Sequence, residues 1–330
     1  SRVDAVWRVP YQERADEAEA WARRHSIGSA SGDQLRVCLL LVDVQNTFCL
    51  PDFELFVAGP GGKGAVEDNR RLCRFIYRNL HRITRISLTM DTHQAVQIFH
   101  AVFLVDEHGN HPDPFTQISK QDVESGRWRL NPGLPGVLSL NAGDAVDYVQ
   151  HYARQLEERK KFVWTIWPYH AMLGGLDHAL VSSVHEAVFF HSIARSSPPE
   201  FVTKGQHPLT EHYSALGPEI QEWPDGRRLA KKDDSFVRRL AGFDRIVLAG
   251  QAKSHCVAWT IADLIAHPDL NDPSALGRIY LLEDCTSPVV IPGTVDFSEE
   301  ADAAFKRFSE AGLKIVRTDQ QMDRWPGFLA

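Results

Sequence analysis

The segment RVCLLLVDVQNTF at residues 36–48 decides the fold. It begins with an unbroken apolar run, Val37–Val42, with no polar residue alternating among its members. A strand with this pattern is buried on both faces, which is typical of a parallel sheet covered by helices on each side. The first polar side chain after the run is Asp43, so the segment also predicts a carboxylate at the carboxyl end of the strand.

Outward from this segment, strand-like runs alternate with helix-like runs, as in a doubly wound α/β domain. Further strands are expected at about residues 83–90, 161–166, 201–203, 245–250, 278–284 and 314–318. Helices are expected at about residues 64–81, 144–159, 176–192, 254–265 and 298–312. The sequence therefore predicts an α/β fold, a doubly wound six-stranded parallel sheet that takes in six of these seven strand-like runs, with helices on both faces.

Two regions do not belong to this alternation. Residues 1–35 form an N-terminal extension, for which the sequence predicts a charged helix followed by a Gly/Ser turn. Residues 101–160 form an insertion rich in His, Asp, Pro and Gly that ends in an amphipathic helix. An insertion of this length is usually a functional lid, an oligomer contact or a disordered segment. We expect one domain over residues 36–330 that contains this insertion.

Composition excludes several classes of partner. A net charge of −7 gives no basic field for nucleic acid or an anionic membrane, and no apolar run approaches the ~18 residues of a membrane helix. The five cysteines show no CxxC spacing, which argues against a disulfide framework or a thiolate zinc site and suits a reducing compartment. The amino terminus lacks the apolar core of a signal peptide. We expect a cytoplasmic protein with a small-molecule substrate, and homo-oligomerisation stays open.

Three reactive side chains fall at the carboxyl ends of expected strands, where active sites of such sheets lie. Asp43 closes the first strand, Lys204 follows the run at 201–203, and Cys256 lies just past the run at 245–250. Ser254 is the expected N-cap of the next helix, so Cys256 falls in its first turn, where the helix dipole favours a thiolate. A nucleophilic thiol with a carboxylate as base and a lysine beside both predicts covalent catalysis. Each residue by itself also suits an ordinary role, the cysteine in packing, the aspartate in a turn and the lysine on a solvated surface.

A second group of polar residues points to a metal. Asp91 and His93 end the second strand, and His170 closes the run WPYH that ends the third. One carboxylate and two imidazoles suit a divalent ion with positions left open for water or substrate. By itself the Asp-x-His pair has an ordinary explanation, a hydrogen-bonded pair at a strand end.

Three segments resemble the signature motifs of the nicotinamidase/isochorismatase-like cysteine hydrolase family. They are DVQNTF at 43–48, VTKG at 202–205 with YSAL at 213–216, and GQAKSHCV at 250–257. The resemblance implies a catalytic triad of Asp43, Lys204 and Cys256. It also implies a cis peptide bond between Gln251 and Ala252, with the backbone N–H groups of Ala252 and Cys256 as the oxyanion hole.

The Asp-x-His and Trp-Pro-x-His motifs resemble those of the metal-dependent nicotinamidases in particular. The resemblance implies that Asp91, His93 and His170 hold one divalent ion, zinc first and iron or manganese as alternatives, which binds the pyridine nitrogen of nicotinamide. Where nicotinamidases often carry a further histidine, this chain has Gln97, and His100 follows three residues later. Whether either approaches the metal stays open.

The substrate pocket is expected to include Phe48 and Trp167. Their positions match the residues that sandwich the aromatic ring in nicotinamidases, although both also suit an ordinary hydrophobic core. The resemblance covers residues 36–100 and 161–320 and implies hydrolysis of nicotinamide, or a related small amide, to the carboxylic acid and ammonia. Alternatives are an isochorismatase-like or N-carbamoyl or other small-amide hydrolase with a remodelled pocket, and a catalytically idle interaction domain.

Overall fold

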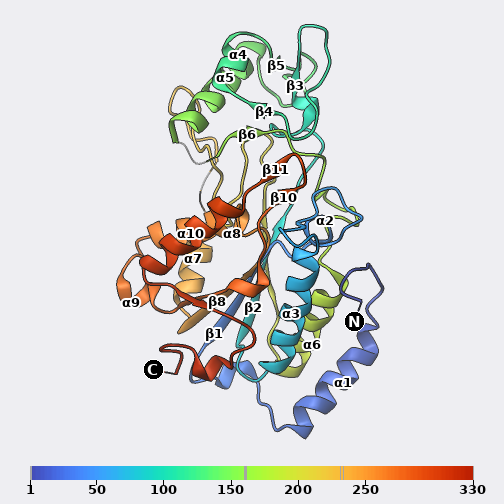
Figure 1. Ribbon diagram of the computed structural model, residues 1–330, viewed down its shortest axis with the longest axis vertical. Helices are drawn as coiled ribbons and strands as arrows, with labels where there is room; N and C mark the ends of the chain where they lie inside the picture. The colour runs from blue at the N-terminus through green and yellow to red at the C-terminus, as the bar shows by residue number, and fades with distance from the viewer. Residues whose placement is uncertain (1, 160–161, 231, 233, 330) are drawn as a thin grey trace.

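The computed structural model describes residues 2–159, 162–230, 232 and 234–329. A central parallel sheet crosses the middle of the molecule (Figure 1). Its six strands, in spatial order, are β12 (Lys314–Val316), β9 (Ile279–Leu282), β8 (Arg245–Gly250), β1 (Val37–Val42), β2 (Arg85–Asp91) and β7 (Glu200–Lys204). Every neighbouring pair is parallel. The predicted doubly wound six-stranded sheet is confirmed, with β1 near its centre and buried along its whole length.

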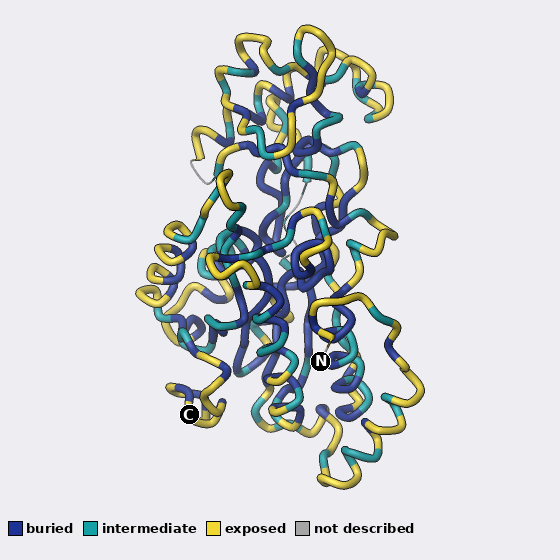
Figure 2. The backbone as a smooth tube through the Cα atoms, turned by 45° about the vertical axis from the view of Figure 1, so that its right-hand side comes forward, coloured by how far each residue is buried: buried dark blue, intermediate teal, exposed yellow. Residues whose placement is uncertain are grey.

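Helices cover both faces of the sheet (Figure 1). One layer contains α3 (Gly64–Arg78) and α6 (Ser182–Arg195), and the N-terminal α1 (Tyr11–Arg24) packs on α6. The other contains α7 (Asp234–Ala241), α8 (Cys256–Ala266) and α10 (Ser298–Glu310), with the short α9 (Pro273–Leu276) nearby. Figure 2 shows how burial changes across the molecule, with buried residues at the centre and exposed turns outside. No helix among the described residues is both long and apolar enough to cross a membrane.

The strand expected at 161–166 is the main error in the predicted sheet. Residue 161 lies outside the described residues, and the strand that forms is the two-residue β6 (Trp164–Thr165). It pairs antiparallel with β4 (Gln117–Ile118), outside the central sheet. The place beside β2 is taken instead by β7, which pairs with β2 over five positions. A parallel pair of that length is stabilised by more ladder hydrogen bonds than a two-residue strand can make.

The predicted helix at 176–192 begins later, at Ser182. The residues before it use their carbonyl groups to hold the loop after β1. Ala179 and Asp177 accept from the backbone N–H groups of Asn46 and Thr47, and these two residues belong to α2 (Asn46–Cys49). Carbonyls committed to a neighbouring segment do not close helical turns, so the helix starts only after them.

The insertion is folded and forms a lobe beyond the carboxyl ends of the central strands (Figure 1). It contains β3 (Leu104–Val105), β4, α4 (Lys120–Glu124), β5 (Arg129–Leu130) and α5 (Ala142–Arg159). The amphipathic helix expected at 144–159 is confirmed as α5, and the predicted end of the insertion at residue 160 lies outside the described residues. A two-stranded sheet, β10 (Val290–Ile291) with β11 (Val295–Asp296), lies between the sheet and this lobe.

Candidate active site

The register of the sheet brings the predicted polar residues together. Asp91 at the end of β2 pairs directly with Lys204 at the end of β7. Val42, the last residue of β1, pairs with Gly250 at the end of β8, so Asp43 follows at the same edge. The Gln45 side chain fixes Asp91, because its Oε1 accepts from the Asp91 N–H at 2.7 Å and its Nε2 donates to the Asp91 carbonyl at 2.8 Å.

Asp43 is a fully buried carboxylate held in one orientation. Its backbone is in the left-handed region with a φ of 47°, which turns the chain sharply at the end of β1. The Thr89 hydroxyl donates to Asp43 Oδ1 at 2.5 Å and accepts from the Asp43 N–H at 3.0 Å. Burial raises the pKa of Asp43, and the opposing positive charge of Lys204 lowers it only in part. A carboxylate with a raised pKa is suited to accept and return a proton.

Lys204 is the centre of the group. Its Nζ lies 3.0 Å from Asp43 Oδ2, 2.9 Å from Asp91 Oδ1 and 3.5 Å from Cys256 Sγ, and it also donates to the His212 carbonyl at 3.0 Å. Burial by itself would lower the pKa of Lys204, but the two carboxylates raise it well above its ordinary value. The side chain is therefore a permanent cation. The oxygens of Asp43 and Asp91 and the sulfur of Cys256 lie within 4.8 Å of one another, so the ammonium group already supplies the cation that these three groups would otherwise attract.

Cys256 is the first residue of α8, as expected, but the predicted N-cap is wrong. His255 occupies that position without a side-chain hydrogen bond to the helix. The Ser254 hydroxyl instead accepts from the Val289 N–H at 3.0 Å, so it is committed to a neighbouring loop. The expected resting thiolate is also not supported. Burial raises the pKa of the Cys256 thiol well above its ordinary value, although Lys204 opposes this. The resting group is a thiol that needs a base.

The peptide bond between Gln251 and Ala252 is cis, as the resemblance implied. Two backbone N–H groups lie free beside it. In the part of the chain that the structure describes, neither the Ala252 nor the Cys256 N–H donates a hydrogen bond to another protein group. Free donors at the start of a helix can bind a developing negative charge.

Asp91, His93 and His170 form a second buried group, whose ligand atoms lie within 4.8 Å of one another. Each imidazole is held by a carbonyl. His93 Nδ1 lies 3.1 Å from the Gly205 carbonyl and His170 Nδ1 lies 2.7 Å from the Pro168 carbonyl. Because a carbonyl only accepts, both Nδ1 atoms donate, and both Nε2 atoms turn towards Asp91 at 2.9 and 4.0 Å. Carbonyls that fix the imidazoles in this way are typical of metal-binding histidines. The donor set and its orientation therefore fit a divalent cation.

His170 reaches this group by a route different from the predicted one. It does not follow a strand of the central sheet. Isolated bridges pair Trp167 with His100 and Met172 with His93, and the His93 N–H donates to the Ala171 carbonyl at 2.9 Å. These bridges align the segment 167–172 beside the chain that leaves β2, so the two histidine rings come within 4.7 Å between centroids.

The structure also locates the two residues whose approach to the metal was open. Gln97 donates to the Gly205 carbonyl, the same carbonyl that holds His93. The His100 ring lies 5.9 Å from each of the His93 and His170 rings, and its buried Nε2 has no partner among the described residues. Burial lowers the pKa of His100 to about 4, so its ring is neutral at physiological pH. His100 borders the group, whereas Gln97 only shares the Gly205 carbonyl with His93.

A narrow pocket joins the two groups. Phe48 and Trp167 both line it, together with Asp91, His170, Ala252 and Cys256. Both aromatic residues are also buried, so each of them belongs to the hydrophobic core and lines the pocket at the same time. The cavity encloses about 30 Å³, which is room for little more than a water molecule. Side chains must therefore move apart to admit an aromatic ring.

Three further pocket residues with polar side chains were not predicted from the sequence as site residues. Glu211, Tyr213 and His255 line the same cavity. Burial raises the pKa of Glu211 to about 7, and the Tyr213 hydroxyl accepts from Trp167 Nε1 at 2.9 Å. Tyr213 belongs to the YSAL motif and His255 precedes the cysteine, so proximity to motifs was the available signal for both. No pattern in the sequence marks Glu211.

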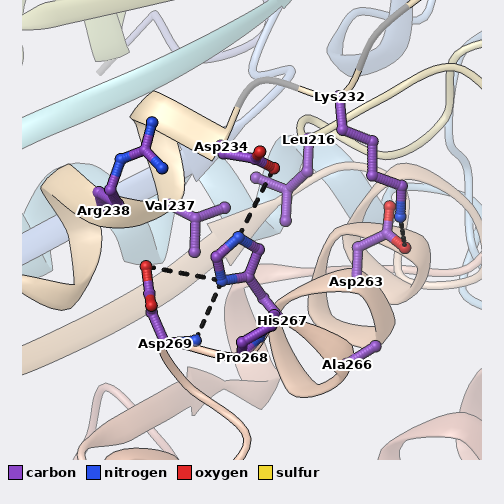
Figure 3. Close-up of a pocket in the computed structure, with 10 residues that line it drawn as sticks. All are labelled: Leu216, Lys232, Asp234, Val237, Arg238, Asp263, Ala266, His267, Pro268 and Asp269. Carbon is purple, nitrogen blue, oxygen red and sulfur yellow. Dashed lines mark hydrogen bonds and ion pairs between the residues drawn. The ribbon is translucent and has the colours of Figure 1, made fainter.

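Another hollow, of about 470 Å³, lies away from this site between α7 and the end of α8 (Figure 3). Its charged side chains largely satisfy one another. Lys232 pairs with Asp263 at 2.9 Å, and His267 lies 3.6 Å from Asp234 and 3.9 Å from Asp269. No reactive group of the kind found beside Cys256 lines this hollow.

Comparison with known proteins supports the architecture. The sequence matches no family model and no curated protein. Among solved structures, the Acinetobacter baumannii nicotinamidase/pyrazinamidase is 18% identical, with a TM-score of 0.51, and the alignment covers 87% of this chain and 99% of that one. The yeast nicotinamidase Pnc1p is also 18% identical, with a TM-score of 0.50 and coverage of 85% and 99%. The structure of Pnc1p with the inhibitor nicotinaldehyde gives a TM-score of 0.51 at 17% identity, with coverage of 85% and 99%. At these identities the likeness concerns the fold: the chain has the isochorismatase-like hydrolase fold of the nicotinamidase structures.

Proposed function

We propose that the chain is a metal-assisted cysteine amidohydrolase that converts nicotinamide, or a related small amide, to the carboxylic acid and ammonia. One observation carries the proposal: the Lys204 ammonium contacts Asp43, Asp91 and Cys256 in a buried pocket. A purely structural ion pair would need only one carboxylate beside the lysine. The second carboxylate and the thiol therefore favour a catalytic role. The nicotinamidase structures with the same fold agree with this chemistry.

In the proposed reaction Asp43 takes the proton from the Cys256 thiol as the sulfur attacks the amide carbon. The carbon–sulfur bond forms while the carbonyl π bond becomes an oxyanion. The free N–H groups of Ala252 and Cys256 bind this oxyanion, a contribution of ~3 kcal/mol per donor in comparable sites. Asp43 then returns the proton to the leaving nitrogen, and ammonia departs as the carbonyl re-forms. Water, with Asp43 again as the base, hydrolyses the thioester and restores the thiol.

Lys204 keeps this cycle balanced in charge. Its permanent positive charge offsets Asp43 before the proton moves and the thiolate character after it. The raised pKa of the Cys256 thiol keeps that group neutral at rest. The Lys204 ammonium opposes the effect of burial on the pKa of Asp43 and so favours the carboxylate that accepts the proton. This is the arrangement from which proton transfer and attack can proceed together.

Asp91, His93 and His170 would hold the divalent ion, zinc first and iron or manganese as alternatives. When bound, such an ion supplies a Lewis-acid docking point for a ring nitrogen. Phe48 and Trp167 would then flank the ring, since both line the cavity between the ion site and Cys256. A pyridine carboxamide is the amide that uses both ends of this pocket.

The insertion at 101–160 is proposed to complete the site. The Tyr152 hydroxyl of α5 accepts from the Glu211 N–H at 3.3 Å, and the Tyr148 hydroxyl donates to the Leu209 carbonyl at 2.7 Å. Both tyrosines are fully buried. They hold the segment after Lys204 that supplies Glu211 and Tyr213 to the pocket, so the insertion supports part of the pocket wall.

A second candidate is hydrolysis of a larger amide, and one observation favours it. A hollow of about 620 Å³ lies on the far side of Tyr213 and His255, which line both cavities. Its walls include Trp259, Phe297 and Phe308, which suit an aromatic or aliphatic extension. Movement of the two shared side chains would join the spaces.

The test is ammonia release by metal-replete protein from nicotinamide, benzamide and a panel of bulkier amides. Benzamide has the same shape without the ring nitrogen, so we expect its kcat/KM to be at least about thirtyfold lower, the equivalent of ~2 kcal/mol. Equal turnover would contradict the contact between ring nitrogen and metal. Turnover confined to bulkier amides would favour the second candidate, and no turnover of any amide would refute amide hydrolysis.

A further inference from the structure

A buried carboxylate that belongs to neither polar group lies beside the segment that carries Ala252. Asp68 is in the second turn of α3 and is only 2% exposed. Its Oδ2 accepts from Gln251 Nε2 at 2.8 Å and from the Ser287 hydroxyl at 2.7 Å, while its Oδ1 accepts from the partly exposed Arg71 at 2.8 Å. Acidic residues on helices usually face water, so this burial requires a reason.

The partners of Asp68 fix the chain on both sides of Ala252. The Gln251 N–H donates to the Val42 carbonyl at 2.8 Å, and Gln251 Oε1 accepts from the Ser287 N–H at 3.3 Å. On the other side, the Lys253 N–H donates to the Ser287 carbonyl at 2.8 Å. Ser287 thus holds both neighbours of Ala252, and Asp68 holds Ser287 and Gln251.

Stability alone does not account for this arrangement. Hydrogen bonds to a buried carboxylate contribute little net stability once desolvation is counted, and apolar side chains of similar volume would pack as well. Unlike apolar contacts, such hydrogen bonds fix the orientation of the groups that they join. An oxyanion donor must point to within a few tenths of an ångström of the place where charge develops.

We propose that Asp68 is a positioning residue, which acts through Gln251 and Ser287 to aim the Ala252 N–H at the carbonyl of an amide bound at Cys256. This inference rests on the proposed amidase function. It assigns a role to a residue of α3 that lies outside every motif of the sequence.

The test compares Asp68→Ala with Asp68→Asn and with Glu67→Ala. Glu67 precedes Asp68 on the same helix and pairs with Arg70 at 2.8 Å, as Asp68 does with Arg71, but at the surface. In Asp68→Asn the amide oxygen can still accept from Gln251 and Ser287, while the NH₂ takes the place of Oδ1 and only the partly exposed Arg71, which can turn towards water, loses its acceptor. Asp68→Ala should lower kcat by at least about tenfold. The loss should stay below the about 10²-fold that follows from removing an oxyanion donor altogether. Asp68→Asn should recover most of the activity, and Glu67→Ala should match the wild type.

Two inhibitors separate positioning from general damage. Nicotinaldehyde has an aldehyde carbon that a thiol can attack, so in the proposed site its adduct with Cys256 would place an oxygen where the oxyanion develops. Its affinity should fall with kcat in Asp68→Ala, by about tenfold or more, whereas the affinity for nicotinate should change less than twofold. If both affinities fall alike, or if folded Asp68→Ala keeps the wild-type kcat, the positioning role is refuted.

Hydrogen exchange provides a readout that does not depend on turnover. The Lys253 N–H should exchange at least about tenfold faster in Asp68→Ala than in the wild type or in Glu67→Ala, since its acceptor is no longer held. Unchanged exchange would overturn the inference even in an active enzyme. If the wild type hydrolyses no amide, the proposed function fails, while faster exchange in Asp68→Ala would still show that Asp68 holds this segment.

Discussion

Replacing Lys204 by Met should destabilise the protein by an amount that grows with pH. The change removes the ammonium that lies 3.0 Å from Asp43 and 2.9 Å from Asp91 and keeps a side chain of similar length. Removing one partner of a buried ion pair typically costs about 3–5 kcal/mol, because an uncompensated charge stays behind. Here two carboxylates within 4.8 Å of each other lose their common cation.

The two carboxylates can reduce this cost by retaining a proton. Burial already raises the pKa of Asp43, and loss of the ammonium raises it further. Asp43 has a higher pKa in the folded variant than in the unfolded chain. At pH values between these two, the folded variant binds more protons than the unfolded chain, so the free energy of unfolding falls as pH rises. The slope is up to about 1.4 kcal/mol per pH unit for one retained proton. From pH 5.5 to 7.5 the gap between wild type and variant should therefore widen by up to about 3 kcal/mol.

Urea unfolding followed by tryptophan fluorescence, at both pH values and with a chelator present, measures this gap. Lys253→Met is the matched control for stability. Lys253 is also largely buried, but its partner Asp302, at 2.5 Å, has a side chain that is 73% exposed and can be solvated. The control should cost about 1 kcal/mol or less with no dependence on pH. A Lys204→Met variant that shows the same small cost at both pH values would refute the account of Lys204 as the shared counter-charge.

Four other predictions follow from the site and its supports. Cys256→Ala should lower kcat/KM at least about 10²-fold without loss of folding, and residual turnover of more than a few per cent in an ammonia assay would remove it as the nucleophile. His170→Ala should reduce bound metal, measured by plasma mass spectrometry, from about one equivalent to less than a tenth; unchanged content would remove His170 from the ligand set. Burial lowers the pKa of His191 to about 4. Its contribution of about 3 kcal/mol to the free energy of unfolding is therefore present above pH 6.5 and lost as pH falls towards 4. His191→Gln should make the free energy of unfolding depend less steeply on pH in this range, and an unaltered slope would contradict this. Tyr152→Phe removes the hydroxyl that accepts from the Glu211 N–H and should raise KM by about threefold to tenfold. Kinetics identical to those of the wild type would contradict this role.

The site was predictable as far as strand ends determine it. Parallel strands end at one edge of a sheet, so a sequence that places Asp43, Lys204 and Cys256 after three such strands already brings them near one another. The same reasoning located Asp91 and His93. It failed for His170, which was assigned to a strand of the sheet and in fact lies beside Asp91 and His93 through isolated bridges to the chain after β2.

What the sequence determined by itself was therefore the class of fold, the run of helices and strands and the chemistry at their ends, because hydrophobic period and polar strand ends are local properties of the chain. The tertiary structure decided the rest. It placed β7 rather than β6 beside β2, brought Glu211 into the pocket, and joined Asp68 of α3 to Gln251 across 183 residues of sequence. These contacts depend on which buried polar groups find partners when the layers pack, and no local pattern records that choice.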